Sequence, residues 1–283
     1  MTHAIASLGD IAERYDAVLS DVWGVIHDGK AAFPEPCAAL ARFRTERGPV
    51  LLLSNAPRPG DEVIKLLDQL GVPRDAYDGI LTSGDAARTE MARRGASAFH
   101  HIGRDIDRTV WAGMPVREVM LESAEFILCT GLHDDERETP DDYVDTLKTA
   151  REMGLMMICA NPDLQVHRGT KLIWCAGALA AAYEKLGGDV VYLGKPHPPI
   201  YDEALRRMSE MKGIALEPSR ILAIGDGLRT DILGANRTGI DALFITSGIH
   251  GEMFEADPDA STVMAALSDQ ELFASAFQPR LKW

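Results

Sequence analysis

The chain has 283 residues, of which 46% are hydrophobic and 25% are charged. This composition is that of a soluble globular protein with room for one large domain or two smaller ones. Acidic residues outnumber basic ones, and the formal net charge of −14 at pH 7 disfavours nucleic acid and anionic membranes as partners. An anionic ligand would therefore need local positive charge or a bound cation at its site.

The four cysteines are Cys37, Cys129, Cys159 and Cys175, which lie far apart and form no Cys-x-x-Cys pair. This spacing suggests neither a zinc site nor a disulfide framework, so we expect reduced core residues. The first 15 residues lack a basic stretch followed by a long apolar run, and no run of about 18 apolar residues occurs elsewhere. A cytoplasmic location is the expectation that follows.

Four short apolar runs predict strands of one sheet, at 17–19, 50–53, 221–224 and 242–245. Each is followed by polar residues, and an amphipathic helix over about 61–70 ends at Gly71. The alternation of strands and helices predicts a parallel sheet covered by helices. Because ligands of such sheets bind beyond the carboxyl ends of the strands, we expect Asp21, Ser54 and Asp226 to converge there.

The region between these core strands has secondary structure of its own. Strands are predicted at 98–102, 126–129 and 156–160, one helix from Pro140 to Gly154, and another ending at 187–188. No low-complexity linker separates this region from the rest. We therefore predict a core domain at 1–88 and 190–283 and an inserted α/β domain at 89–189.

Three aspartates are predicted to form an acidic cluster at the carboxyl edge of the core sheet. Asp226 ends a strand, Asp231 follows five residues later near a helix start, and Asp21 follows the first strand. Carboxylates this close raise one another's pKa unless a cation neutralises them, and hard oxygen ligands suit Mg²⁺. The pattern predicts a magnesium site, with Asp231 open to two interpretations: metal support or capping of its helix.

Lys195 stands beside a predicted helix start, in the segment Gly194-Lys195-Pro196-His197-Pro198-Pro199. Proline suits the first turn of a helix, where backbone N–H groups are free. We expect Lys195 to hold Asp21 ionised and to neutralise a phosphoryl group. Ser54 and the backbone that follows it would donate hydrogen bonds to phosphate oxygens.

Taken in order, these segments resemble the haloacid dehalogenase (HAD) superfamily of hydrolases, and the resemblance spans essentially the whole chain. The segments Asn161-Pro162-Asp163 and Gly177-Ala178-Leu179 are similar to those of subfamily IIA, which has a large α/β cap inserted after the second motif. That subfamily includes NagD-type nucleotide and sugar phosphatases and 4-nitrophenyl phosphatases. The resemblance implies a doubly wound parallel, Rossmann-like core with an inserted smaller α/β cap domain.

The resemblance also implies roles for individual residues. Asp21 would attack phosphorus and form an aspartyl-phosphate, with Ser54 and Lys195 as further catalytic residues. The residues implied in phosphate or substrate binding are Ser54, Asn55, Arg58, Asn161 and Lys195. Those implied in holding Mg²⁺ are Asp21, Trp23 through its backbone carbonyl, Asp226 and Asp231.

The function expected is Mg²⁺-dependent hydrolysis of a small phosphate ester, such as a sugar phosphate or nucleoside monophosphate. The expected partner is thus a small phosphorylated metabolite rather than nucleic acid or a membrane. The sequence does not decide the oligomeric state, and a homodimer stays open.

The chain departs from the family pattern at Trp23, where phosphatases of the family have an aspartate that protonates the leaving group and then activates water. Indole can do neither, and such assistance contributes about 10²–10⁴ in rate. The alternative function is therefore a weakened protein that binds phosphometabolites with little turnover. His27 or Asp28 is a candidate replacement for the missing acid.

Two further points stay open on the sequence. Trp23 is equally compatible with packing beside the site and with a stacking platform for a ring-bearing ligand. His167 and Arg168 would either reach the substrate or lie on a solvated loop, and the solvated loop is slightly favoured.

Overall fold

The computed structural model describes residues 2–95, 97–168, 171–251, 253–254 and 258–283, and the chain divides into two compact units. The core unit comprises Met1–Ser54, Ile64–Leu81 and Lys195–Trp283. The inserted unit comprises Asn55–Val63 and Thr82–Gly194.

These units differ from the predicted domains in three segments, because 55–63, 82–88 and 190–194 belong to the inserted unit although the predicted core domain included them. Hydrogen bonds join the first two of these segments to each other. The Gly84 N–H donates to the Ala56 carbonyl at 3.1 Å, the Thr82 hydroxyl donates to the Arg58 carbonyl at 2.7 Å, and the Gly60 N–H donates to the Asp85 carboxylate at 3.0 Å. Such hydrogen bonds between segments distant in the chain leave no pattern in the sequence.

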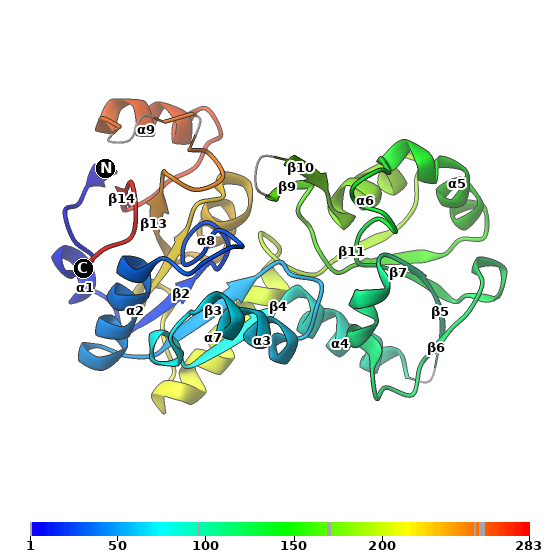
Figure 1. The fold of residues 1–283 in the computed structure, drawn as a ribbon, viewed down its shortest axis with the longest axis horizontal. Helices are drawn as coiled ribbons and strands as arrows, with labels where there is room; N and C mark the ends of the chain where they lie inside the picture. The colour runs from blue at the N-terminus through cyan, green and yellow to red at the C-terminus, as the bar shows by residue number, and fades with distance from the viewer. Residues whose placement is uncertain (1, 96, 169–170, 252, 255–257) are drawn as a thin grey trace. The chain divides into compact units, whose positions relative to one another are not determined.

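In the described part of the chain, the core unit contains a seven-stranded sheet in the order β1-β14-β13-β12-β2-β3-β4 (Figure 1). The strands are β1 (His3–Ala4), β2 (Ala17–Ser20), β3 (Val50–Ser54), β4 (Gly79–Thr82), β12 (Ile221–Gly225), β13 (Asp241–Ile245) and β14 (Ala276–Gln278). β12 pairs in parallel with both β2 and β13, and β2 pairs in parallel with β3. The four core strands predicted from apolar runs are thus confirmed as neighbours in one parallel sheet.

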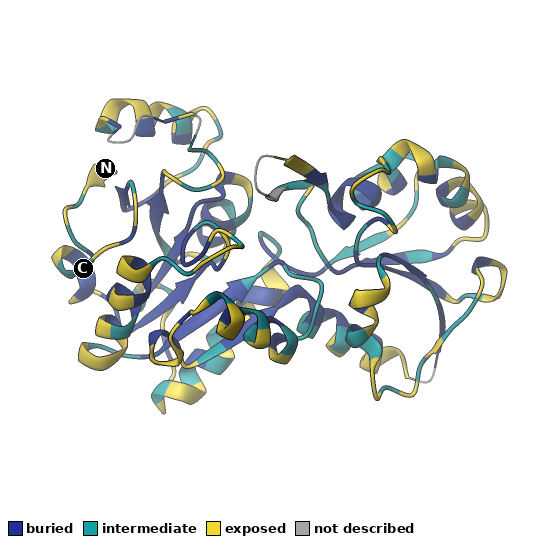
Figure 2. Ribbon diagram, in the orientation of Figure 1, coloured by how far each residue is buried: buried dark blue, intermediate teal, exposed yellow. Residues whose placement is uncertain are grey.

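Both faces of this sheet are covered, because β2 and β12 are buried along their whole length (Figure 2). Alternate residues of a strand point to opposite faces, so Leu19 and Leu51 share one face. That face packs against apolar residues of α7, α8 and α9. The helices that lie wholly or partly in the core unit are α1 (Gly9–Ala12), α2 (Pro34–Glu46), α3 (Gly60–Leu70), α7 (Pro198–Lys212), α8 (Leu233–Thr238) and α9 (Ala260–Ser268).

The strand order reverses direction between β2 and β12. From β2 the chain continues outward through β3 and β4, whereas from β12 it continues the other way through β13 and β14. Crossovers that diverge in this manner leave a crevice beyond the carboxyl ends of the two central strands. Asp21 and Asp226 directly follow those two strands, so the topology alone places them at the switch point.

The inserted unit has a sheet of its own, with five strands in the order β11-β8-β7-β5-β6 in the described residues. The strands are β5 (Ala98–Ile102), β6 (Arg117–Glu118), β7 (Phe126–Cys129), β8 (Met156–Cys159) and β11 (Val190–Tyr192). All these pairings are parallel. One face packs on α5 (Val144–Glu152) and α6 (Ala176–Lys185), and the other on α4 (Ser83–Arg94).

Two predictions for the insert are refined. The helix expected from Pro140 begins as a short 3-10 turn, Pro140–Tyr143, before α5 starts at Val144. The expected loop around His167 and Arg168 is wrong, because these residues belong to β9 (Gln165–Arg168), which forms an antiparallel hairpin with β10 (Lys171–Trp174). Each strand has only four residues, and β9 holds one apolar residue, Val166, so the hairpin gives a weaker apolar signal than the predicted core strands.

The four cysteines are buried free thiols, as predicted. None of the helices in the described ranges combines the length and the apolar character that crossing a membrane requires.

Candidate active site

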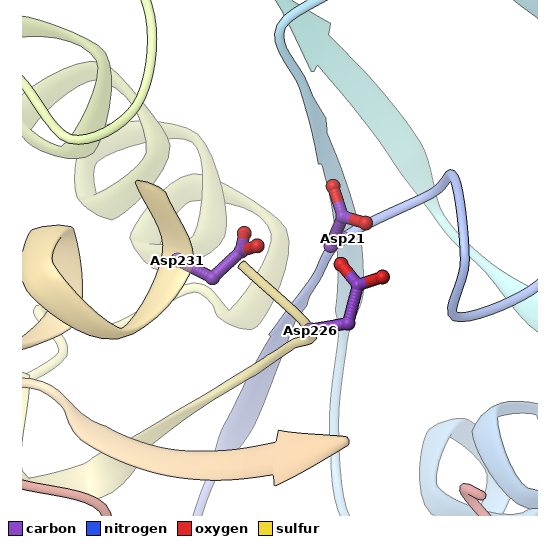
Figure 3. A group of neighbouring side chains, drawn as sticks. All are labelled: Asp21, Asp226 and Asp231. Atoms are coloured by element: carbon purple, nitrogen blue, oxygen red, sulfur yellow. The ribbon is translucent and has the colours of Figure 1, made fainter. Parts of the chain in front are cut away.

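Three carboxylates gather at the switch point of the core sheet (Figure 3). Asp21 follows β2, Asp226 follows β12, and Asp231 lies in the π-helical turn Leu228–Ile232 just before α8. All three are buried, and one oxygen from each lies within 4.8 Å of the others. The predicted acidic cluster is therefore present in the structure.

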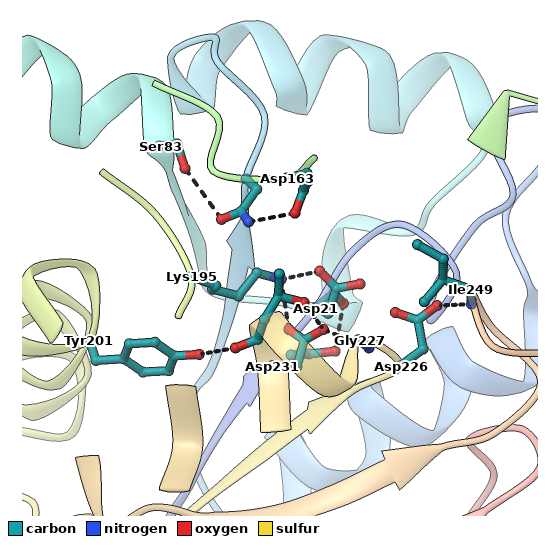
Figure 4. Close-up of polar contacts among 12 residues, drawn as sticks. Asp21, Ser83, Asp163, Lys195, Tyr201, Asp226, Gly227, Asp231 and Ile249 are labelled. Carbon is teal, nitrogen blue, oxygen red and sulfur yellow. Dashed lines mark hydrogen bonds and ion pairs between the residues drawn. The ribbon is translucent and has the colours of Figure 1, made fainter. Parts of the chain in front are cut away.

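Lys195 lies against two of these carboxylates (Figure 4). Its Nζ donates to Oδ1 of Asp21 and, at 2.7 Å, to Oδ1 of Asp231. The other oxygen of Asp231 accepts the Gly227 N–H at 3.0 Å, within the same turn. Asp231 thus belongs to the cluster and also satisfies a backbone donor, although it does not occupy the N-cap position of α8.

The cluster carries more negative than positive charge, since three carboxylates face one ammonium group. Burial raises the pKa of Asp21 to about 7, with Lys195 opposing this shift and Asp231 adding to it. Burial, Asp21 and Asp231 together hold the pKa of Asp226 well above its usual value. Burial by itself would lower the pKa of Lys195, but Asp21 and Asp231 outweigh it and raise that pKa.

A divalent cation fits this donor set. The ligands are hard carboxylate oxygens, they converge, and their excess of two negative charges matches the charge of one such ion. Burial and the neighbouring carboxylates raise the pKa values of Asp21 and Asp226, and a bound cation would favour their charged forms.

Two glycines allow Asp226 to sit where it does. A Cβ built on Gly24 would lie 2.2 Å from Asp226 Oδ2, and one on Gly248 would lie 1.8 Å from the same oxygen. The Ile249 N–H donates to that oxygen at 2.6 Å. The sequence analysis missed Gly248 and Ile249, and the available signal was their position just after the fourth predicted core strand, 242–245.

The predicted phosphate-binding residues divide between the two units. Ser54 ends β3 in the core unit, where Lys195 also lies, whereas Asn55, Arg58 and Asn161 belong to the inserted unit. No observation of the described residues tests their contact with a phosphate, so those roles stay predictions.

The side chain of Asn55 is held at both ends inside the inserted unit. Its Nδ2 donates to Asp163 Oδ1 at 2.9 Å, and its Oδ1 accepts the Ser83 hydroxyl at 3.4 Å. Asn161 supports the same arrangement, because its Oδ1 accepts the Asp163 N–H at 3.1 Å. The Asn161-Pro162-Asp163 segment therefore positions the residue that follows Ser54.

Arg58 lies near a buried carboxylate of the inserted unit. Its Nε is 3.7 Å from Oδ1 of Asp107, whose side chain is almost fully buried. Burial raises the pKa of Asp107, while Arg104 and Arg58 oppose this shift. Sequence reasoning gave no sign of Asp107, since it falls in an irregular 3-10 segment, Asp105–Trp111.

The loop after Asp21 is held by its own side chains. Trp23 is 42% exposed, and its ring rests on Gly29, where a Cβ would lie 2.4 Å from the indole. His27 meets this ring edge-on, with centroids 5.1 Å apart, and its Nδ1 accepts the Gly29 N–H at 2.9 Å. Trp23 therefore packs on its own loop and still presents an exposed aromatic surface.

Neither candidate replacement for the missing acid is set up for that role. His27 is 2% exposed, and burial lowers its pKa to about 4, so it is neutral at pH 7. Asp28 is exposed and accepts the backbone N–H groups of Ala31 and Lys30, which lower its pKa. The side chains of His167 and Arg168 lie outside the described residues.

A parallel α/β sheet with buried carboxylates and a buried lysine at its switch point defines a Rossmann-like protein with a buried acidic centre. A family model described as haloacid dehalogenase-like hydrolase matches residues 18–115, and a second, described as HAD-hydrolase-like, matches residues 192–269. A solved haloacid dehalogenase-like hydrolase from Brucella suis 1330 is 42% identical, with a TM-score of 0.87. That match covers 97% of this chain and 98% of the other.

Named phosphatases are also similar. Ribonucleotide monophosphatase NagD of Escherichia coli K12 is 26% identical over 240 residues, which cover 82% of this chain and 88% of NagD. The solved 4-nitrophenylphosphatase from Thermotoga maritima shares the fold, with a TM-score of 0.71 at 19% identity over 95% of this chain and 96% of that one. The chain belongs to the haloacid dehalogenase-like hydrolases, and within them to the NagD-like subfamily IIA. The resemblance inferred from the motifs and the expected fold class are thereby confirmed.

Proposed function

We propose that this hydrolase is a Mg²⁺-dependent phosphatase of small phosphorylated metabolites, of the sugar phosphate or nucleoside monophosphate class. The observation that carries the proposal is the buried arrangement of Asp21, Lys195, Asp226 and Asp231 at the switch point. Similarity to a nucleotide phosphatase supports phosphoric monoesters as substrates. We assign the inserted unit the role of a cap, which would favour compact substrates over macromolecules.

In the proposed mechanism, a carboxylate oxygen of Asp21 attacks phosphorus, and the bond from phosphorus to the leaving oxygen breaks. Lys195 orients Asp21 and offsets the negative charge around it. Water then attacks the aspartyl-phosphate and regenerates the carboxylate. Ser54 and the backbone N–H of Asn55 would donate to the phosphoryl oxygens.

Asp21, Asp226, Asp231 and the Trp23 carbonyl would hold the Mg²⁺ ion. When bound, the ion supplies positive charge that screens the phosphoryl oxygens from the carboxylates.

Removal of the cation is expected to abolish turnover. Phosphate release from a panel of phosphate monoesters should stop in EDTA and return when Mg²⁺ is added. A cation at 100 times its Kd should also stabilise the fold by about 2.7 kcal/mol, measured as a rise in Tm. Asp226→Asn is the matched control, and in it the Tm response should be strongly reduced. Undiminished activity in EDTA would contradict the metal assignment.

Gly248→Ala is expected to weaken the cation site, because the new Cβ would overlap the Asp226 carboxylate and force it to move. Displacing the support of a ligand costs about 10–100-fold in metal affinity or activity. The Mg²⁺ concentration for half-maximal activity should rise accordingly. Gly131→Ala is the control, since a Cβ there meets nothing within 4 Å. An unchanged Mg²⁺ requirement in Gly248→Ala would show that Asp226 is not a ligand.

A second candidate function is a protein that binds phosphometabolites with little turnover, and Trp23 is the observation that favours it. Such a protein would bind phosphate esters in calorimetry but release no phosphate with any member of the panel. Turnover that disappears in Asp21→Asn would exclude this alternative.

A further inference from the structure

Cleavage of a phosphate ester leaves negative charge on the departing oxygen. An alkyl alcohol has a pKa close to that of water, about 15.7, so its oxygen departs slowly unless a nearby acid protonates it. A phenol, with a pKa of about 10, and a carboxylic acid, with a pKa of about 4, depart readily as anions. The supply of a proton beside Asp21 therefore decides which esters can transfer their phosphoryl group to Asp21 at a useful rate.

The loop that follows Asp21 offers no such proton. Trp23, its exposed side chain nearest to Asp21 in sequence, carries an indole N–H that donates hydrogen bonds but does not transfer a proton. His27 is buried and uses Nδ1 to accept the Gly29 N–H. Asp28 is exposed, and its carboxylate accepts two backbone N–H groups of its own turn.

Three groups near the cluster in the described part of the chain, Lys195, Tyr201 and His250, also make hydrogen bonds of their own. Among the described residues, Lys195 is the positively charged side chain within hydrogen-bond distance of Asp21. Its ammonium group donates to both Asp21 and Asp231. The hydroxyl of Tyr201 is buried and points at the Thr230 carbonyl, 3.4 Å away. The half-buried ring of His250 accepts the Leu228 N–H through Nε2.

We infer that this enzyme is selective for phosphate compounds with an acidic leaving group, namely aryl, enol and acyl phosphates, and that alkyl phosphates bind but turn over slowly. The inference rests on the proposed phosphatase function and revises its substrate class, because sugar phosphates and nucleoside monophosphates are alkyl esters. It also connects the two candidate functions. For these ligands the protein behaves mainly as a binder.

The chemistry balances without a protein acid. An oxygen of Asp21 forms a bond to phosphorus, and the bond to the leaving oxygen breaks, leaving its electron pair on a departing aryloxide, enolate or carboxylate. Water then adds to phosphorus, the Asp21 oxygen leaves with its electron pair, and the extra proton of water passes to the solvent. The exposed face of Trp23 provides a flat apolar surface that suits an aromatic leaving group.

The test is the dependence of kcat/KM on leaving-group pKa, measured with Mg²⁺ for the full chain. The substrates are acetyl phosphate, 4-nitrophenyl phosphate, phenyl phosphate, glycerol 3-phosphate and glucose 6-phosphate. We expect a steep dependence, with the alkyl esters slower than the aryl esters by at least about 10²-fold. The alkyl esters should nevertheless inhibit 4-nitrophenyl phosphate hydrolysis competitively.

Two variants sharpen the result. Trp23→Asp should accelerate the alkyl esters by about 10²–10⁴-fold and the aryl esters far less, which flattens the dependence. Trp23→Phe, which supplies an aromatic ring and no acid, should keep the steep dependence. If Trp23→Asp does not fold, the wild-type and Trp23→Phe measurements still test the inference.

A shallow dependence in the wild type would overturn the inference, since it would reveal a proton donor, for example one supplied by the inserted unit. The phosphatase proposal would survive that result. Absence of turnover with every substrate, with or without Mg²⁺, would instead remove the phosphatase proposal and the inference together.

Discussion

Asp21→Asn is expected to reduce phosphate release by about 10⁴-fold to 10⁶-fold, the range that loss of a catalytic group costs in covalent hydrolases. An amide oxygen is a far weaker nucleophile than a carboxylate, and asparagine has the same shape as aspartate. Lys195 keeps its second partner, Asp231, so the local structure should persist. The variant also removes one negative charge from the cluster, and its affinity for inorganic phosphate should be retained or increased.

The measurements for Asp21→Asn are kcat with 4-nitrophenyl phosphate and phosphate affinity by calorimetry. Asp28→Asn is the matched control, because this carboxyl lies on the same loop but is exposed and accepts backbone N–H groups of its own turn. Its kcat should stay within a few-fold of the wild type. Substantial turnover in Asp21→Asn would show that another group attacks phosphorus.

Lys195→Met is expected to destabilise the fold by about 3–5 kcal/mol in the absence of a divalent cation. Removing one partner of a buried ion pair leaves an uncompensated buried charge, and here two carboxylates lose their partner together. Because Mg²⁺ would replace part of the lost positive charge, the deficit should shrink when the ion is added. Turnover should nevertheless fall, since Asp21 loses the group that orients it.

The free energy of unfolding of Lys195→Met, measured by urea denaturation with and without Mg²⁺, checks this expectation. Arg206→Met is the control, since Arg206 also pairs with two carboxylates, Glu203 and Glu210, but is 55% exposed. Exposed pairs contribute about 0–1 kcal/mol, so this control should change little. Equal effects of the two substitutions would argue that burial of Lys195 has no energetic consequence.

Much of the core fold could be predicted because its strands are buried on both faces and therefore appear as continuous apolar runs. The runs before Asp21, Ser54 and Asp226 correspond to β2, β3 and β12, in one parallel sheet. The hairpin β9–β10 was missed because its strands have four residues each, β9 with one apolar residue and β10 with an apolar run of only three.

The acidic cluster was predictable because parallel strands end at the same edge of a sheet, so that residues following them meet regardless of their distance along the chain. The supports of the cluster were not. Gly248 and Ile249 fix Asp226 through a close approach and a backbone hydrogen bond. Neither leaves a side-chain signal that sequence reasoning can use.

The sequence by itself determined the family, the parallel core and the three aspartates with their lysine, because these depend on residue type and on order along the chain. Only the tertiary structure decided how the side chains are used. It showed that Asn55 is held by Ser83 and Asp163, and that the segment from Asn55 packs with the insert. It also showed that His27 is buried, contacts the Trp23 ring and accepts the Gly29 N–H, an arrangement that does not suit a general acid. Hydrogen-bond partners and burial arise from contacts between segments distant in the chain, and no local pattern encodes them.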